Sequence, residues 1–163
     1  MGYLGGIGWA ILVARVCKDN PKMAPNQLLH RFFEFFRDYQ WGAENPVTLC
    51  PIANDPSIVK FAIDPDLIQP PDPKAFMPIF TPSFPSMNAP YNVGESTRYA
   101  ILTEFEKAAM ITNELTKNKG TSQITWKRLF KQFPFFRAYE HFIEIQVLSK
   151  SEEEHKMWYG FCE

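Results

Sequence analysis

Residues 2–15 read GYLGGIGWAILVAR, a glycine-rich turn that runs directly into an apolar helix pattern. Glycines ahead of a helix let the backbone approach a ligand closely, and the free N–H groups of the helix start favour phosphate. Close packing between helices would explain the same Gly5-Gly6 pair without any ligand, so both interpretations stay open. Because the chain starts inside such a turn, we expect it to be a piece of a longer protein.

The helical pattern continues past the first proline. An apolar face predicts a helix over 7–17 that ends at Asn20-Pro21, and a second helix that begins at Pro25, a favoured first-turn residue. Large apolar side chains cover more than one stripe of this second helix, so we expect it to be buried on most sides. They are Leu28, Leu29, Phe32, Phe33, Phe35, Phe36 and Tyr39.

Most of the 14 prolines lie between residues 46 and 90. Proline removes a hydrogen-bond donor and disfavours helix in the residue before it, so regular structure should be scarce there. Apolar side chains interleave with the prolines, which predicts a long loop pinned to the helices. The interleaved residues are Phe61, Ile63, Leu67, Ile68, Phe76, Met77, Ile79, Phe80 and Phe84.

This loop ends in two short motifs, MPIFTPSFP at residues 77–85 and NAPYNV at residues 88–93. The Thr81 hydroxyl, held between prolines and followed by asparagine amides, suits recognition of a base edge. Loop scaffolding is the alternative explanation. Asp64 and Asp66 lie outside both motifs, and we interpret them as turn residues.

Two helix-start signals mark the second half of the chain. Asn92 and Glu95 have the spacing of a capping box, which predicts a helix over 93–117. Residues 118–120 (NKG) supply its stop. A short helix should follow over 125–130 and a strand over 142–148 (FIEIQVL), while Ser151 and Glu154 form a second capping box before a last helix.

Composition and charge exclude only some classes of protein. The net charge is −1, which neither supports nor excludes an RNA partner. Lys127, Arg128, Lys131 and Arg137 form a local basic cluster that suits either RNA or a solvated helix face. The three cysteines lack metal-ligand spacing and indicate a reducing compartment, and the apolar run over 7–16 is too short to span a bilayer.

Together these motifs resemble the eukaryotic nuclear-type poly(A) polymerases. The family run Gly-(Phe/Tyr)-Leu-Gly-Gly-x-x-Trp-Ala-x-Leu-Val-Ala-Arg is matched by residues 2–15. Met-Pro-Ile-x-Thr-Pro-x-aromatic-Pro is matched by residues 77–85, and Tyr-Asn-Val-x-x-Ser-Thr-Arg by residues 91–98. The similarity covers nearly the whole chain and is weakest between about residues 42 and 75.

The resemblance implies a mainly α fold. Residues 1–133 would be the helical central domain with its long Pro-rich loop region. Residues 134–163 would begin a C-terminal RRM-like α+β domain that binds RNA and is incomplete here.

The resemblance also implies site residues. Gly5, Gly6 and Ile7 would line the triphosphate region of ATP, Thr81 would lie near adenine, and Asn92 would contact the RNA primer. Asn92 also has the position of a helix cap, so its two roles compete. The family's metal-binding aspartates belong to a preceding nucleotidyltransferase domain, so we expect no catalytic or metal-binding residue in this chain.

The implied activity is that of a polynucleotide adenylyltransferase, which adds AMP from ATP to the 3′ end of pre-mRNA in the nucleus with Mg²⁺ or Mn²⁺. This chain would form one wall of the ATP and RNA cleft and would be inactive alone. Cleavage and polyadenylation factors are expected partners of the full-length enzyme, and a membrane is not. Two alternatives stay open: another terminal nucleotidyltransferase, such as a uridylyltransferase, and a non-catalytic helical interaction module.

Overall fold

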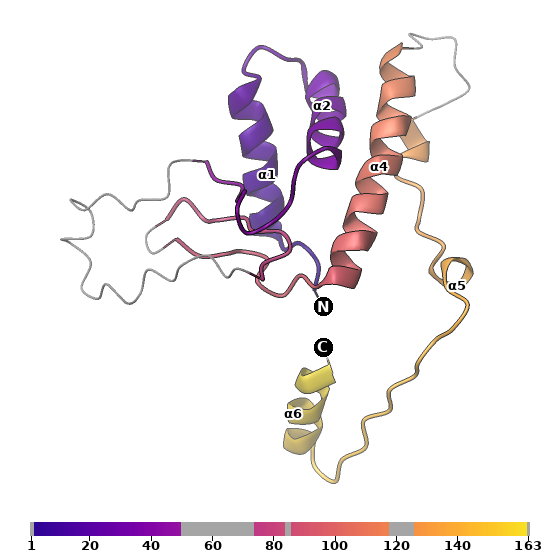
Figure 1. The fold of residues 1–163 in the computed structure, drawn as a ribbon. Coiled ribbons are helices and arrows are strands. Elements are labelled where there is room, and N and C mark those ends of the chain that lie inside the picture. Colours follow the sequence, from indigo (N-terminus) through magenta and orange to yellow (C-terminus); the bar gives the residue numbers. More distant parts are fainter. Residues whose placement is uncertain (1, 50–73, 84–85, 118–125, 163) are drawn as a thin grey trace, which may run out of the picture. The chain divides into compact units, whose positions relative to one another are not determined.

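The fold comes from a computed structural model, in which the chain divides into two compact units (Figure 1). The units are Gly2–Leu129 and Phe130–Glu163, and each is considered by itself. Within the described residues, none of the helices is both long and apolar enough to cross a membrane. The described residues are 2–49, 74–83, 86–117 and 126–162.

Helix α1 (Gly6–Asp19) begins where the glycine turn ends. Gly5 is extended, with φ −75° and ψ 170°, and its carbonyl oxygen accepts the Trp9 N–H at 3.1 Å. At the other end, the Asn20 side-chain amide donates to the Val16 carbonyl oxygen at 2.9 Å, which satisfies one of the last helix carbonyls. The predicted helix over 7–17 is thus confirmed. Its buried face consists of Gly8, Ile11, Leu12 and Val16.

Helix α2 (Pro25–Arg37) begins at the predicted proline. Phe36 is 0% exposed and Phe32 is buried beside it, with their ring centroids 5.0 Å apart. Burial of each such ring stabilises the fold by about 1.5–3 kcal/mol. Phe33 and Phe35 are only half-buried, so α2 is less enclosed than its sequence predicted.

Helix α4 (Glu95–Lys117) packs along α2, and Phe105 is the centre of their contact. The Phe105 ring lies 5.9 Å from the Phe32 ring and 5.8 Å from the Trp9 ring, so α1, α2 and α4 share one aromatic core. A polar pair crosses the same interface, because His30 Nδ1 lies 3.1 Å from the buried Thr112 Oγ1. The Thr112 hydroxyl donates to the Ala108 carbonyl oxygen at 2.8 Å and must therefore accept from the imidazole.

The predicted start of this third helix is wrong. Helix α4 begins at Glu95, so Asn92 lies too early to cap it. The Thr97 hydroxyl accepts the Gly94 N–H at 3.0 Å, and the Gly94 carbonyl oxygen accepts the Arg98 N–H at 2.9 Å. The N-cap of the helix is therefore Gly94, where the Thr97 side chain makes the return bond of a capping box two residues later than the predicted one.

The Pro-rich loop is pinned to the core wherever the structure describes it. Met77, Ile79 and Phe80 are buried, as predicted. Val47 and Ile79 form a parallel bridge, and Phe80 and Asn88 form an antiparallel one. The interpretations of Phe61, Ile63, Asp64, Asp66, Leu67, Ile68 and Phe84 lie outside the described residues.

Two basic side chains of α1 hold the entry to this loop. Arg15 donates to the Thr48 carbonyl oxygen at 3.1 Å and pairs with Asp19 at 2.8 Å. Lys18 donates to the Leu49 carbonyl oxygen at 2.7 Å. The basic residues of this helix are therefore engaged in fixing backbone, and we assign them a structural role.

The end of the first unit is a 3-10 turn, η2 (Trp126–Arg128), in place of the predicted helix over 125–130. Arg128 lies 3.6 Å from Glu114 of α4, an exposed ion pair that contributes little stability. Because Lys131 and Arg137 belong to the other unit, the predicted basic cluster divides between the two units.

The second unit contains helices α5 (Phe135–Ala138) and α6 (Glu152–Cys162). The predicted strand over 142–148 is wrong, since these residues form no strand. A strand needs a partner for its backbone groups, and the described residues supply none here. The capping box before α6 is partly confirmed, as the Ser151 hydroxyl accepts the Glu154 N–H at 3.2 Å. The division at residue 134 and the RNA-binding domain beyond it stay predictions.

Candidate functional site

The sequence motifs converge at the end of the first unit where α1 and α4 begin (Figure 1). A Cβ placed on Gly2 would lie 3.2 Å from the Asn92 carbonyl oxygen and 3.1 Å from Thr97 Cγ2. Gly2 also has φ +60°, so this position requires glycine for both backbone shape and space. The glycine turn is thereby joined to the turn that precedes α4.

The motif at residues 77–85 reaches the same end through Ile79. A Cβ placed on Gly8 would meet Ile79 Cδ1 at 4.0 Å and the Leu4 side chain at 3.8 Å. Both distances are ordinary van der Waals contacts. Ile79 therefore lies against the first turn of α1, so this part of the loop joins the glycine turn and the start of α4 at one surface.

Gly5 and Gly6 stand open on this surface. A Cβ placed on either residue meets no heavy atom of the described residues within 4 Å, and Gly2 is the described residue with positive φ. Among the described residues, neither close helix packing nor a left-handed backbone accounts for the Gly5-Gly6 pair, so the ligand interpretation is favoured and stays a prediction. No side chain caps α1, and Ile7 is 64% exposed beside the free N–H groups. Such an uncapped helix start favours an anion.

Thr81 closes a turn with its hydroxyl. Its Oγ1 accepts the Met87 N–H at 3.0 Å and the Ser83 hydroxyl at 3.2 Å. The Ser86 hydroxyl donates to the Thr81 carbonyl oxygen at 2.6 Å. Thr81 therefore has a scaffolding role that can coexist with base recognition, because a hydroxyl that accepts two hydrogen bonds still has a proton to donate.

The two asparagines have different surroundings. Asn88 Oδ1 accepts the Ile79 N–H at 3.0 Å, so Asn88 holds the turn together. Asn92 is exposed, and its side chain makes no hydrogen bond to the described part of the chain. The competition between capping and ligand contact at Asn92 is thus decided against capping.

The start of α4 brings one acidic side chain, Glu95, to this end. Across the described residues, no three His, Cys, Asp or Glu side chains gather in a way that could hold a metal ion. Asp38 is paired with Arg37 at 2.6 Å, and this hydrogen bond lowers the pKa of the Asp38 carboxyl. Burial raises the pKa of the Tyr39 phenol, whose hydroxyl donates to the Asn45 carbonyl oxygen. Neither group is a candidate general base.

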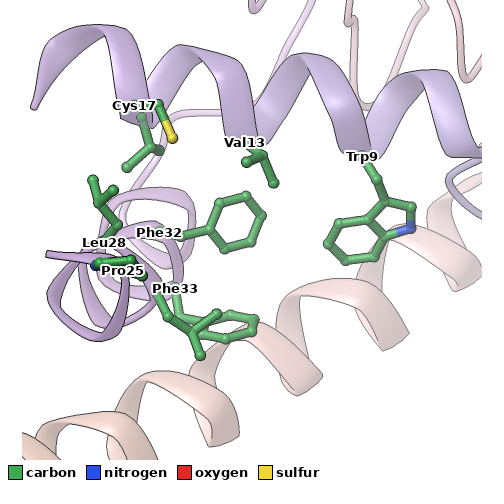
Figure 2. A pocket seen from close by; sticks show the side chains of 9 residues that line it. Trp9, Val13, Cys17, Pro25, Leu28, Phe32 and Phe33 are labelled. Atoms are coloured by element: carbon green, nitrogen blue, oxygen red, sulfur yellow. The ribbon is translucent and has the colours of Figure 1, made fainter. Parts of the chain in front are cut away.

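An apolar pocket of about 360 Å³ lies elsewhere, between α1 and α2 (Figure 2). Val13 and Trp9 point into it from α1, and Phe32 points into it from α2. A triphosphate or a base edge needs hydrogen-bond partners, and this lining is apolar, so the pocket does not suit a nucleotide. Its lining residues are Trp9, Val13, Val16, Cys17, Pro25, Leu28, Leu29, Phe32 and Phe33.

The first unit is thus a helical domain that presents an uncapped helix start and two polar turns at one end. A family model described as "Poly(A) polymerase central domain" matches residues 1–132. The chain belongs to this family.

Curated relatives agree with the family. A protein of Dictyostelium discoideum named "Poly(A) polymerase" is 38% identical over 100% of this chain and 19% of its own length. Two proteins of Arabidopsis thaliana, "Nuclear poly(A) polymerase 1" and "Nuclear poly(A) polymerase 4", are 38% and 36% identical over 99% of this chain, which covers 22% and 21% of the relatives. The chain spans about a fifth of the length of the curated relatives that it matches.

Proposed function

We propose that this chain is the central part of a polynucleotide adenylyltransferase, which adds AMP from ATP to the 3′ end of RNA. The observation that supports the proposal is the open Gly5-Gly6 pair, which neither packing against the described residues nor backbone conformation requires. A glycine pair on an open helix start is explained by a ligand that must approach the backbone. The membership of the chain in the poly(A) polymerase family supports ATP as that ligand.

Each proposed role follows from the position of its residue. The backbone at Gly5, Gly6 and Ile7 passes the ATP triphosphate, where free N–H groups favour negative charge. Thr81 donates its hydroxyl proton toward adenine while its oxygen keeps the turn closed. Asn92 uses its free side-chain amide to bind the RNA primer.

The family implies Mg²⁺ or Mn²⁺, but the described residues offer no ligand set for either ion. We therefore assign no chemical step to residues of this chain. Their part is to bind and orient the nucleotide and the primer, and this end forms one wall of the cleft. Since the described residues supply no metal site, we expect the 163-residue chain to be inactive alone.

The names of the relatives extend the proposal to location and partners. Two of the cited relatives are called nuclear, which supports a nuclear enzyme that acts on pre-mRNA. Cleavage and polyadenylation factors are the partners that we propose for this enzyme on pre-mRNA.

Primer extension tests this proposal. The full-length protein, given Mg²⁺ and a labelled oligo(A) primer, should add nucleotides from ATP far better than from UTP. The 163-residue chain should add none under the same conditions. Preference for UTP would favour a uridylyltransferase, and a full-length protein inactive with every nucleotide would favour an interaction module.

A further inference from the structure

Tyr91 is the most exposed aromatic side chain at this end of the unit. Its side chain is 83% exposed, although it stands in a tight turn between two buried residues, Pro90 and Val93. The Val93 N–H donates to the Pro90 carbonyl oxygen at 3.1 Å and closes this turn. The backbone that carries Tyr91 is therefore anchored on both sides while its ring is held out in water.

The position of this ring is fixed by its neighbour. The carbonyl oxygen of Asn92 lies against Gly2, so Tyr91 stands at the end where the glycine turn and the start of α4 meet. An exposed aromatic ring contributes no hydrophobic stabilisation to the fold, although the turn that carries it is anchored on both sides. A ring presented in this way fits a flat, apolar partner.

We propose that the Tyr91 ring stacks on a base of the RNA 3′ end, an inference that rests on the proposed adenylyltransferase function. Every base has a π face, so stacking holds a homopolymer of adenines without reading its sequence. Asn92, one residue further, supplies the polar contact to the same primer. The ring is the functional part of Tyr91, and the phenol hydroxyl is dispensable.

The primer is favoured over ATP as the stacked partner because of this adjacency. Asn92 is the residue assigned to RNA, whereas adenine of ATP is assigned to the separate turn closed by Thr81 and Met87. Stacking by Tyr91 should therefore act on the KM of the primer and leave the KM of ATP unchanged.

A matched set of variants in the full-length protein tests the proposal. Tyr91→Ala should raise the KM of oligo(A) about fivefold or more, since loss of one base stack weakens binding at least that much. Tyr91→Phe should behave as wild type. Tyr99→Ala is the control, because Tyr99 is 75% exposed but lies about 200° around α4 from Thr97, which faces Gly2. It should leave both KM values within about twofold of wild type, as for a surface site away from the ligand.

A second readout reports stacking directly. The fluorescence of 2-aminopurine placed at the primer 3′ end should fall on binding to wild type and Tyr91→Phe, and fall less with Tyr91→Ala. The melting temperatures of the variants should match, since the Tyr91 side chain is exposed. An active Tyr91→Ala enzyme with normal primer KM would overturn the stacking and leave the adenylyltransferase intact. A rise in the KM of ATP alone would assign the ring to the nucleotide, and a wild type unable to extend oligo(A) would overturn both proposals.

Discussion

At the scale of single residues, the glycine turn was recognisable in the sequence, but the roles of its individual glycines were not. The sequence left ligand approach and helix packing open at Gly5-Gly6, because the choice depends on which atoms surround an added Cβ. Those atoms come from residues far along the chain. Three glycines near this helix start differ in what surrounds an added Cβ. At Gly2 the neighbours leave no room for it, at Gly8 it would make ordinary contacts, and at Gly6 it would face open space.

Gly6→Val in the full-length protein uses this difference. A Cβ at Gly6 meets no described atom within 4 Å, so the free energy of unfolding should stay within about 1 kcal/mol of wild type. It would stand where the triphosphate passes, so kcat/KM for ATP should fall roughly tenfold or more. Denaturant unfolding and steady-state kinetics measure the two effects.

Gly8→Val, two residues further along the chain, is the matched control. Its methyl groups would crowd Leu4 and Ile79, which already lie at contact distance, and this overpacking should cost about 1–3 kcal/mol of stability. A stable Gly6→Val enzyme with ordinary kinetics would remove the glycine turn from the nucleotide site.

Thr81 carries the second prediction at this scale. Thr81→Val in the full-length protein should lower the ratio of kcat/KM for ATP over GTP about fivefold, since a lost hydrogen bond costs about 1 kcal/mol. Ser86→Ala removes a different hydrogen bond of the turn, to the Thr81 carbonyl oxygen, and keeps the Thr81 hydroxyl. If both variants change selectivity equally, Thr81 acts through the shape of the turn and does not contact the base.

Asn92 shows why local patterns fail at this scale. Its spacing to Glu95 predicted a cap, yet the helix starts later, at a turn closed by the Thr97 hydroxyl. A capping pattern identifies residues able to cap, and several such residues stood within one turn of each other. Which one is used depends on where the chain enters the core, and buried Val93 sets that point.

At the scale of elements, the helices were predictable because their signals are local. Pro25 at a helix start and apolar side chains at helical spacing act within one or two turns. The strand over 142–148 was not predictable in this way. Alternating side chains describe a segment able to pair, and the partner strand must come from elsewhere.

The aromatic core gives a prediction at this scale. Phe36 is 0% exposed, and its ring lies 5.6 Å from the Trp41 ring and 6.4 Å from the Phe105 ring. Phe36→Ala should lower the free energy of unfolding of this chain by about 3–5 kcal/mol, the usual cost of a cavity left by phenylalanine. Phe35→Ala is the control on the same helix and should cost less, since Phe35 is half-buried. Equal losses in chemical denaturation would contradict the packing described for α2.

At the scale of the whole molecule, the proposed site is separate from the apolar pocket of the first unit. The apolar pocket between α1 and α2 offers volume without polar partners, whereas the end where α1 and α4 begin offers open backbone and free polar side chains. The order of the motifs along the chain was enough to indicate the family. The contact of Gly2 with the Asn92 turn shows that motifs about ninety residues apart in sequence are neighbours in the fold. That contact could not be read from the sequence, because no local signal joins the two turns.

The central claim is that this end of the helical unit is a wall of the ATP cleft, and photo-crosslinking tests it most directly. The full-length protein would be irradiated with 8-azido-ATP, with and without excess ATP, and the labelled peptides identified by mass spectrometry. The account predicts label within residues 2–9 or 77–92 that excess ATP abolishes. ATP-protected label that reaches neither segment, or that falls instead on the lining of the apolar pocket at Leu28 and Phe33, would contradict it.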